Sequence, residues 1–171
     1  MTQIIITGFM GSGKSTVARA LAKLLRYQMI DLDDVIESAV GRSARQIIEE
    51  DGEPRFRELE QEALSRFLPT SDKYVIALGG GAWISEANRR AISEHGATSV
   101  WLEAPFSLCW KRITDAAEQR PLARNETEAF ELFTSRASVY ELADLSIGVT
   151  EQKSAIEIAT EILQALDKVT N

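Results

Sequence analysis

Gly8-Phe9-Met10-Gly11-Ser12-Gly13-Lys14-Ser15-Thr16 is the stretch that decides the fold class of this 171-residue chain. It directly follows an apolar run at residues 4–6 and precedes a pattern typical of an amphipathic helix. This sequence matches the motif G-x-x-x-x-G-K-[ST], the loop with which P-loop proteins bind phosphate groups. A glycine-rich turn that happens to precede a helix would not account for this strand–loop–helix context. We therefore predict a nucleotide-binding loop.

The residues of this loop suit the chemistry of phosphate binding. Glycines let backbone N–H groups approach phosphate oxygens, and the following helix adds the positive end of its dipole. Lys14 can reach the β- and γ-phosphates, and the hydroxyl of Ser15 can bind Mg²⁺. The expected nucleotide-binding residues are Gly11, Ser12, Gly13, Lys14, Ser15 and Thr16.

Composition and charge narrow the class of protein. Hydrophobic residues make up 44% of the chain and charged residues 26%, which is ordinary for one globular domain. No apolar run approaches the ~20 residues that a membrane span needs, and no signal peptide precedes the first strand. The single cysteine, Cys109, excludes an intramolecular disulfide and fits a cytoplasmic protein. A net charge of −7 argues against nucleic acid as the main partner, and we expect a monomer.

Short β-rich runs alternate with helical patterns along the chain. Two helical patterns have apolar residues at a period near 3.6, one after the glycine-rich loop and one at residues 155–169. Such alternation predicts a doubly wound α/β fold, a parallel sheet with helices on both faces, in a single domain spanning residues 1–171. The predicted strands are residues 3–7, 28–31, 74–78, 99–102 and 145–149.

Two stretches look like insertions into this domain. The first, at about residues 33–68, is a long and strongly charged helical region. The second, at about residues 115–128, has few apolar residues and no core face, so we expect it to be exposed. Arg120 and Arg124 bracket a Pro-Leu-Ala turn there, which favours a mobile lid over a plain solvated loop.

Asp31, Asp33 and Asp34 follow the second predicted strand. Residues two apart in an extended chain face the same way, so Asp31 and Asp33 should share a side at the ligand-binding edge of the sheet. One carboxylate could hold a Mg²⁺-bound water, and the other could accept a proton or hydrogen bonds from a substrate hydroxyl. Asp34 suits the N-cap of the next helix. The alternative, that all three merely begin a helix, is disfavoured behind a P-loop.

For two arginines, the neighbouring sequence gives only weak indications of a role in ligand binding. Arg57 and Glu60 are three residues apart on a predicted helix, where they can form either a surface ion pair or a fixed guanidinium for a substrate carboxylate. The residues alone favour the surface pair. Arg136, on a helix predicted at about residues 127–143, reads as a solvated side chain.

Gly79, Gly80 and Gly81 end the third predicted strand. Three glycines at the carboxyl end of a strand allow backbone N–H groups to approach an anion. A tight turn would need only one or two glycines. We therefore expect a loop that faces a ligand.

Together these motifs make the chain resemble the shikimate kinase family over nearly its whole length. The series is G-F-M-G-S-G-K-S-T, then D-x-D at residues 31–33, G-R-S at 41–43, D-G-E-x-x-F-R-x-x-E at 51–60, L-G-G-G-A at 78–82, Asn88-Arg89, R-P-L at 120–122 and R-x-x-x-Y-x-x-x-A-D at 136–144. The P-loop alone indicates only a nucleotide. F-R-x-x-E combined with the triple glycine is far more specific.

The resemblance implies a reaction, a fold and roles for residues. The reaction converts ATP and shikimate to ADP and shikimate 3-phosphate, with Mg²⁺ as cofactor, and the fold is a five-stranded parallel sheet in the order 2-3-1-4-5 with a helical substrate-binding insertion and a lid. Lys14 and Arg120 would act on the phosphates, with Asp33 binding the shikimate hydroxyls and serving as base. Ser15 and, through water, Asp31 would hold the metal. Arg57 and Arg136 would bind the shikimate carboxylate, which reverses the local interpretation of both arginines, and Gly80 and Gly81 would offer backbone N–H groups. Gly79 is also among the implied substrate-binding residues.

Some positions depart from the family pattern. No proline occurs at residues 148–155, where the family often packs one on adenine, and Ala123 replaces the last leucine of R-P-L-L. Lys111 or Arg112 would supply the other adenine contact, and the sequence does not choose between them. These departures concern adenine binding and lid packing rather than chemistry.

Three other classes of protein share the P-loop. A gluconate-type or other small-metabolite kinase would lack F-R-x-x-E together with the triple glycine. A nucleoside monophosphate kinase would need more phosphate-binding arginines around the acceptor. A regulatory GTPase would need an N-K-x-D guanine-binding string, which this sequence does not contain.

Overall fold

A five-stranded parallel sheet forms the centre of the protein, for which a computed structural model describes residues 3–116 and 125–170. The strands are β1 (Gln3–Thr7), β2 (Gln28–Asp31), β3 (Tyr74–Ala77), β4 (Thr98–Glu103) and β5 (Leu145–Gly148). Their order, β2-β3-β1-β4-β5, confirms the predicted topology. All five lie at the predicted places, although β4 is one residue longer at each end and β3 and β5 each end one residue earlier.

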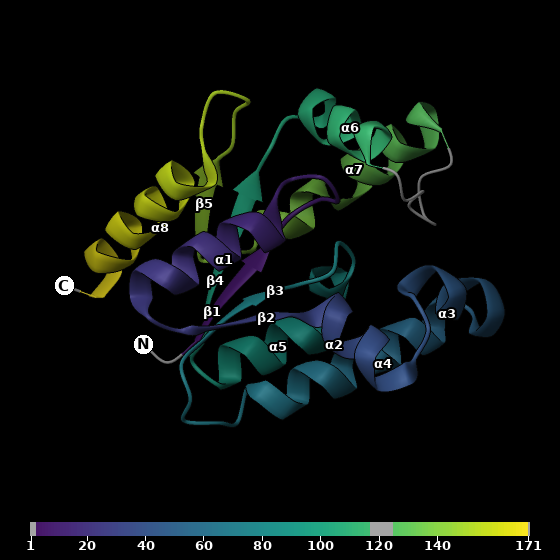
Figure 1. The fold of residues 1–171 in the computed structure, drawn as a ribbon, viewed down its shortest axis with the longest axis horizontal. Helices are drawn as coiled ribbons and strands as arrows, with labels where there is room; N and C mark the ends of the chain where they lie inside the picture. The colour runs from purple at the N-terminus through teal and green to yellow at the C-terminus, as the bar shows by residue number, and fades with distance from the viewer. Residues whose placement is uncertain (1–2, 117–124, 171) are drawn as a thin grey trace.

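Helices cover both faces of the sheet (Figure 1). α1 (Lys14–Leu25) packs against α8 (Ala155–Thr170) on one face. From β1 the chain moves towards the edge of the sheet that ends in β2, whereas from β3 it moves towards the opposite edge. Right-handed crossovers therefore place α5 (Glu86–Glu94) on the opposite face from α1, where it contacts β4. α6 (Phe106–Asp115) and α7 (Glu126–Tyr140) connect β4 to β5. The doubly wound arrangement follows from this reversal.

The first predicted insertion consists of three helices. They are α2 (Leu32–Val40), α3 (Ala44–Asp51) and α4 (Glu53–Phe67), and a single 3-10 turn, η1 (Ala82–Ile84), follows the glycine loop after β3. A complete capping box between Ser43 and Gln46 begins α3, and Gly52 separates α3 from α4. In Figure 1 these helices extend to one side of the sheet. Most of the predicted lid, residues 117–124, lies outside the described residues.

The core is built around β1, the middle strand. All five of its residues are buried, because helices cover both of its faces and β3 and β4 flank it. Its register places Ile6 beside Ala77 of β3, and β2 places Asp31 beside the same residue. The carboxyl ends of β1, β2 and β3 therefore reach one edge of the sheet together. Among the described residues, no helix is long and apolar enough to cross a membrane.

Asp144 joins β4 to the turn that precedes β5. Its Oδ2 accepts hydrogen bonds from the backbone N–H of Ser99 at 2.8 Å and from the Ser99 hydroxyl at 2.6 Å. The Ser99 Oγ in turn accepts a hydrogen bond from the Asp144 N–H at 2.9 Å. Ser99 is buried, so these contacts satisfy groups that have little access to water.

Asp144→Ala should therefore lower the free energy of unfolding by about 1–2 kcal/mol, because it removes the acceptor for two Ser99 donors. Urea denaturation measures the change. Glu94→Ala, which removes an exposed carboxylate, is the control and should stay within about 0.5 kcal/mol of the wild type. Equal losses in the two variants would contradict the role given to Asp144.

Candidate active site

The P-loop connects β1 to α1 at the carboxyl edge of the sheet. Gly11 has a φ of 78°, and a Cβ there would lie 2.5 Å from the carbonyl oxygen of Cys109, so the close approach of α6 requires glycine. Gly13, with a φ of 96°, is the N-cap of α1 and offers no side chain to the first turn. That turn has no side-chain cap and no acidic residue, so the positive end of the helix dipole can attract an anion. The loop therefore suits the phosphates of a nucleotide.

Lys14 lies across this loop. Its Nζ donates a hydrogen bond to the carbonyl oxygen of Phe9 at 2.9 Å, and Arg112 donates from Nη1 to the carbonyl oxygen of Gly11 at 3.2 Å. Lys111 instead pairs with Glu151 at the surface. Of the two residues considered for adenine, only Arg112 thus contacts the P-loop.

A cavity, here called the acceptor cavity, lies beside the P-loop, between the glycine loop and the helical insertion. Its wall combines an apolar part from the insertion with charged groups from three different helices. The residues that line it are Met10, Asp33, Ala44, Ile48, Phe56, Arg57, Glu60, Gly79, Gly80, Gly81 and Arg136. All six residues that the sequence predicted to bind the acceptor are among them. The cavity has the polar and apolar mixture that a small carboxylate-bearing polyol requires.

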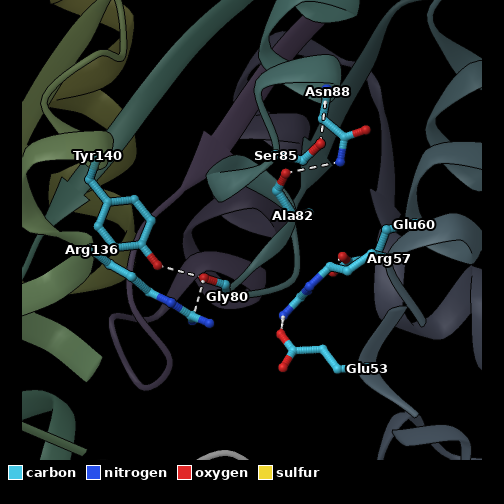
Figure 2. Close-up of polar contacts among 9 residues, drawn as sticks. All are labelled: Glu53, Arg57, Glu60, Gly80, Ala82, Ser85, Asn88, Arg136 and Tyr140. Carbon is cyan, nitrogen blue, oxygen red and sulfur yellow. Dashed lines mark hydrogen bonds and ion pairs between the residues drawn. The ribbon is translucent and has the colours of Figure 1, made fainter. Parts of the chain in front are cut away.

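Arg57 is held by two carboxylates. Its Nη1 donates to Oε2 of Glu60 at 2.6 Å, and its Nη2 donates to Oε1 of Glu53 at 2.6 Å (Figure 2). The side chain of Glu60 is 0% exposed, and that of Arg57 is 25% exposed. The surface ion pair that the local sequence favoured is therefore wrong, because the glycine loop covers the face of α4 that carries both residues. Glu53, four residues before Arg57, was not predicted.

Burial makes Glu60 an unusual acid. It raises the pKa of Glu60 to about 7, with a smaller contribution from Asp33, although Arg57 and Arg136 oppose the change. Oε2 of Glu60 has its bond to Arg57, whereas Oε1 is buried and has no hydrogen-bond partner among the described residues. Glu60 is thus partly protonated near neutral pH.

Two glycines make room for these charged groups. A Cβ at Gly79 would lie 2.5 Å from Oδ1 of Asp33 and 2.9 Å from Oε1 of Glu60. A Cβ at Gly81 would overlap the guanidinium of Arg57. At Gly80 the nearest atom would be the backbone nitrogen of Met10 at 3.5 Å, an ordinary contact. Glycine at the first and third positions of this loop therefore has a structural reason besides ligand binding, since any larger residue there would displace the charged side chains.

Arg136 approaches the glycine loop from the opposite side (Figure 2). Its Nη1 donates to the carbonyl oxygen of Gly80 at 3.1 Å, and the hydroxyl of Tyr140 donates to the same oxygen at 2.5 Å. Arg136 is only 7% exposed, so the solvated side chain favoured by the local sequence is wrong. Burial also raises the pKa of Tyr140 to about 12, which keeps its hydroxyl a donor. Tyr140 had no predicted role, although its spacing from Arg136 is one helical turn.

The three aspartates after β2 do not lie as the sequence suggested. β2 ends at Asp31 and α2 begins at Leu32, so the two-residue alternation of an extended chain does not continue to Asp33. Asp31 is the N-cap of α2 and accepts a hydrogen bond from the Asp33 N–H at 3.2 Å, which makes the N-cap role expected for Asp34 wrong. Asp33 lines the acceptor cavity, whereas Asp31 and Asp34 line a separate surface cavity.

Two predicted site elements involve the lid and the metal. Arg120 lies outside the described residues. Within the described part of the chain, no group of three or more His, Cys, Asp or Glu side chains could hold a metal ion. Mg²⁺ in phosphoryl-transfer enzymes usually binds one or two protein groups together with water and phosphates, so the Ser15 hydroxyl beside the open turn of α1 fits that mode.

Comparison with known proteins decides which family this geometry represents. The family model described as "Shikimate kinase" matches residues 10–167. The chain belongs to the shikimate kinase family. A shikimate kinase of Persephonella marina is 40% identical over 163 residues, covering 95% of this chain and 98% of that relative. A shikimate kinase of Ruegeria pomeroyi is 38% identical and covers 95% of this chain and 84% of the relative.

Solved structures agree with this membership. The shikimate kinase of Acinetobacter baumannii in complex with shikimate superposes with a TM-score of 0.91 at 32% identity, covering 99% of this chain and 94% of that one. A gluconokinase of Sinorhizobium meliloti gives a TM-score of 0.62 at 17% identity, which shows a shared fold alone. The shikimate kinase prediction is confirmed over the gluconate-type alternative.

Glu60 should impose a pH dependence on stability. A carboxyl whose pKa is raised on folding stabilises the protein when protonated, so this contribution is lost as the pH rises from about 4.5 towards about 7. The difference in unfolding free energy between the wild type and Glu60→Gln should fall by about 1.4 kcal/mol per pH unit over this range. Glu62→Gln, an exposed change on the same helix, is the control for the substitution itself. Parallel pH profiles for the wild type and Glu60→Gln would show that Glu60 titrates normally.

Proposed function

We propose that this chain transfers the γ-phosphoryl group of ATP to the 3-hydroxyl of shikimate, as a member of the shikimate kinase family whose charged residues hold the roles given below. The observation that carries the assignment of roles is the acceptor cavity, which places Arg57, Arg136 and Asp33 around one space next to the P-loop. Two guanidinium groups suit a carboxylate, and the carboxylate of Asp33 suits a hydroxyl group. Gluconate and shikimate are both carboxylates, so family membership and not charge separates them.

Each residue then has a limited task. Arg57 and Arg136 bind the shikimate carboxylate, and the N–H groups of Gly79, Gly80 and Gly81 line the same space. Asp33 orients the reacting hydroxyl and accepts its proton as the oxygen attacks phosphorus. Positioning and charge neutralisation account for most of the catalysis of phosphoryl transfer.

The nucleotide side uses the P-loop. Residues 11–16 bind the phosphates, and Lys14 moves from the carbonyl of Phe9 to neutralise the transferring group. Ser15 would hold Mg²⁺ directly and Asp31 would hold it through water, and the ion would reduce the negative charge of the phosphates. Arg120 contributes a further cation from the lid, and the lid excludes water from the reaction. Arg112 is the better candidate for the adenine contact, since it already lies on the loop.

The proposal also includes a cytoplasmic monomer. The one cysteine, Cys109, is buried, and burial raises the pKa of its thiol to about 11, so it is a packing residue rather than a reactive one. Sedimentation equilibrium, which measures the mass of the protein in solution, tests whether it is a monomer.

The function is tested by measuring ADP release with a panel of acceptors: shikimate, quinate, gluconate and nucleoside monophosphates. Shikimate should be the preferred acceptor by kcat/KM, because it matches both the carboxylate site and Asp33. Lys14→Met should lower kcat by about 10²–10³-fold with the fold intact, and it serves as the control for contaminating kinases. Preference for another acceptor would overturn the substrate assignment.

Gly81→Ala tests the position of Arg57 without removing it. The new Cβ would overlap the guanidinium, which can move because it ends a flexible side chain, so the KM for shikimate should rise about 10- to 100-fold. The unfolding free energy and the KM for ATP should change little. Gly80→Ala is the matched control, with a smaller rise because its Cβ meets nothing closer than 3.5 Å. If the two variants behaved alike, the space beside Gly81 would not matter to substrate binding.

A further inference from the structure

Arg57 is already bonded to two carboxylates before any substrate arrives. Glu60 and Glu53 occupy Nη1 and Nη2 of the guanidinium, each at 2.6 Å. A substrate carboxylate at Arg57 would be the third anion on one cation. Arg136, across the cavity, adds one more positive charge, but Asp33 adds another negative one. Binding an anion here therefore requires that some negative charge be removed.

The two glutamates can respond in different ways. The side chain of Glu53 is 44% exposed, so it can release Arg57 and turn into water. Glu60 is fully buried on the inner side of α4 and has no solvent to turn into. The only way in which Glu60 can lose its charge is to accept a proton.

The structure has a place for that proton. Oε1 of Glu60 is buried and has no hydrogen-bond partner among the described residues, whereas Oε2 keeps its bond to Arg57. Oε1 and Oδ1 of Asp33 both crowd the same point beside Gly79, at 2.9 Å and 2.5 Å from the position a Cβ would take. A hydrogen on Oε1 would give this oxygen a donor to share with a neighbouring carboxylate instead of a repulsive contact.

We propose that Glu60 takes up a proton when the carboxylate of shikimate binds Arg57, so that substrate and one proton enter the site together. The proton comes from solvent, adds to Oε1 and leaves again when the product departs. The inference rests on the proposed function, since it requires shikimate to bind at Arg57. It makes Glu60 a positioning residue whose protonation state sets the affinity for an anionic acceptor.

The charged surroundings of Glu60 are consistent with this coupling. Its pKa, already raised to about 7 by burial, would rise further when a nearby anion offsets Arg57. From α3 and the glycine loop, the cavity-lining residues carry no charge, and on α5 Arg89 is engaged with the carbonyls of Trp83 and Ile84. Within the described part of the chain, the charged and titratable groups that face Glu60 or its partner Arg57 are Arg57 and Glu53 from α4, Asp33 from α2, and Arg136 and Tyr140 from α7.

Calorimetric titration of the full-length enzyme with shikimate, without nucleotide, tests the proposal. Repeating it at pH 7.5 in buffers with different ionisation enthalpies gives the number of protons taken up. The wild type should take up about half a proton per shikimate bound, and the dissociation constant should rise by up to about tenfold per pH unit between the pKa of Glu60 in the free enzyme, about 7, and its higher pKa in the complex. Binding without proton uptake would overturn the proposal and would indicate that Glu53 turns away instead.

Variants and a second ligand locate the proton. Glu60→Gln should bind shikimate without proton uptake, whereas Glu53→Gln, which alters the other carboxylate on Arg57, should retain the uptake. The methyl ester of shikimate, which has no negative charge, should bind the wild type more weakly and without a proton. The one histidine, His95, is exposed and does not line the cavity, so His95→Gln should leave the uptake unchanged. Uptake that persisted in Glu60→Gln would assign the proton to another group.

An infrared measurement keeps the test decisive if Glu60→Gln does not fold or bind. The difference spectrum of the wild type with and without shikimate should gain the band of a protonated carboxyl group, and its absence would contradict the proposal. Glu60→Asp, which keeps an acid at this position, should keep both the band and the uptake. If shikimate failed to bind the wild type at all, the proposed function would be at fault rather than the proton coupling.

Discussion

The contact between Arg57 and the buried carboxylate of Glu60 is the interaction on which the acceptor site depends. Glu60 cannot move into water, so it fixes one side of the guanidinium, while Gly81 leaves the room that the other side needs. Removing either partner would leave a charge in a poorly hydrated place, which costs far more than a surface pair contributes. In its proposed role, Arg57 would bind the anion with a side chain whose conformational freedom has already been lost during folding.

Sheet register explains why residues far apart in sequence meet here. β1 and β2 both align with Ala77 at the end of β3, so the P-loop, the start of α2 and the glycine loop leave the same edge. A one-residue slip of β3 would move Gly79 and Gly81 away from Asp33 and Arg57 and turn its side chains to the opposite face. The carbonyl of Gly80, held by Arg136 and Tyr140, fixes the loop after the strand has ended. The relative positions of the site residues are thus set by the register of the sheet.

Local sequence was sufficient for the strands and the P-loop, because their signals are apolar runs and glycine spacing. The order of the strands and the roles of Arg57 and Arg136 came from family resemblance, since the burial of either arginine depends on a loop or helix far away in the chain. Asp31 and Asp34 were misplaced for a different reason: the strand ends at Asp31, two residues before the alternation argument needs it to end, and the N-cap of α2 is Asp31 instead of Asp34. Glu53 and Tyr140 each lie four residues from a predicted arginine, so helical spacing could have identified both as neighbours, but nothing local distinguishes such a pair from a surface one.

An enzyme of this kind must bind two anions side by side within a chain whose net charge is −7. In the proposed roles the phosphates and the carboxylate would not compete for the same partners, because the P-loop, the start of α1 and Lys14 would meet the first, and guanidinium groups from α4 and α7 would meet the second. Carboxylates beside those arginines reduce the positive potential of the empty cavity. Among the described residues, the buried Arg136 has neutral partners, the carbonyl of Gly80 and the side chain of Tyr140, and in the proposed role shikimate would supply the missing negative charge. Selectivity then follows from the cost of leaving a buried cation poorly paired, and not from the attraction of a positively charged surface.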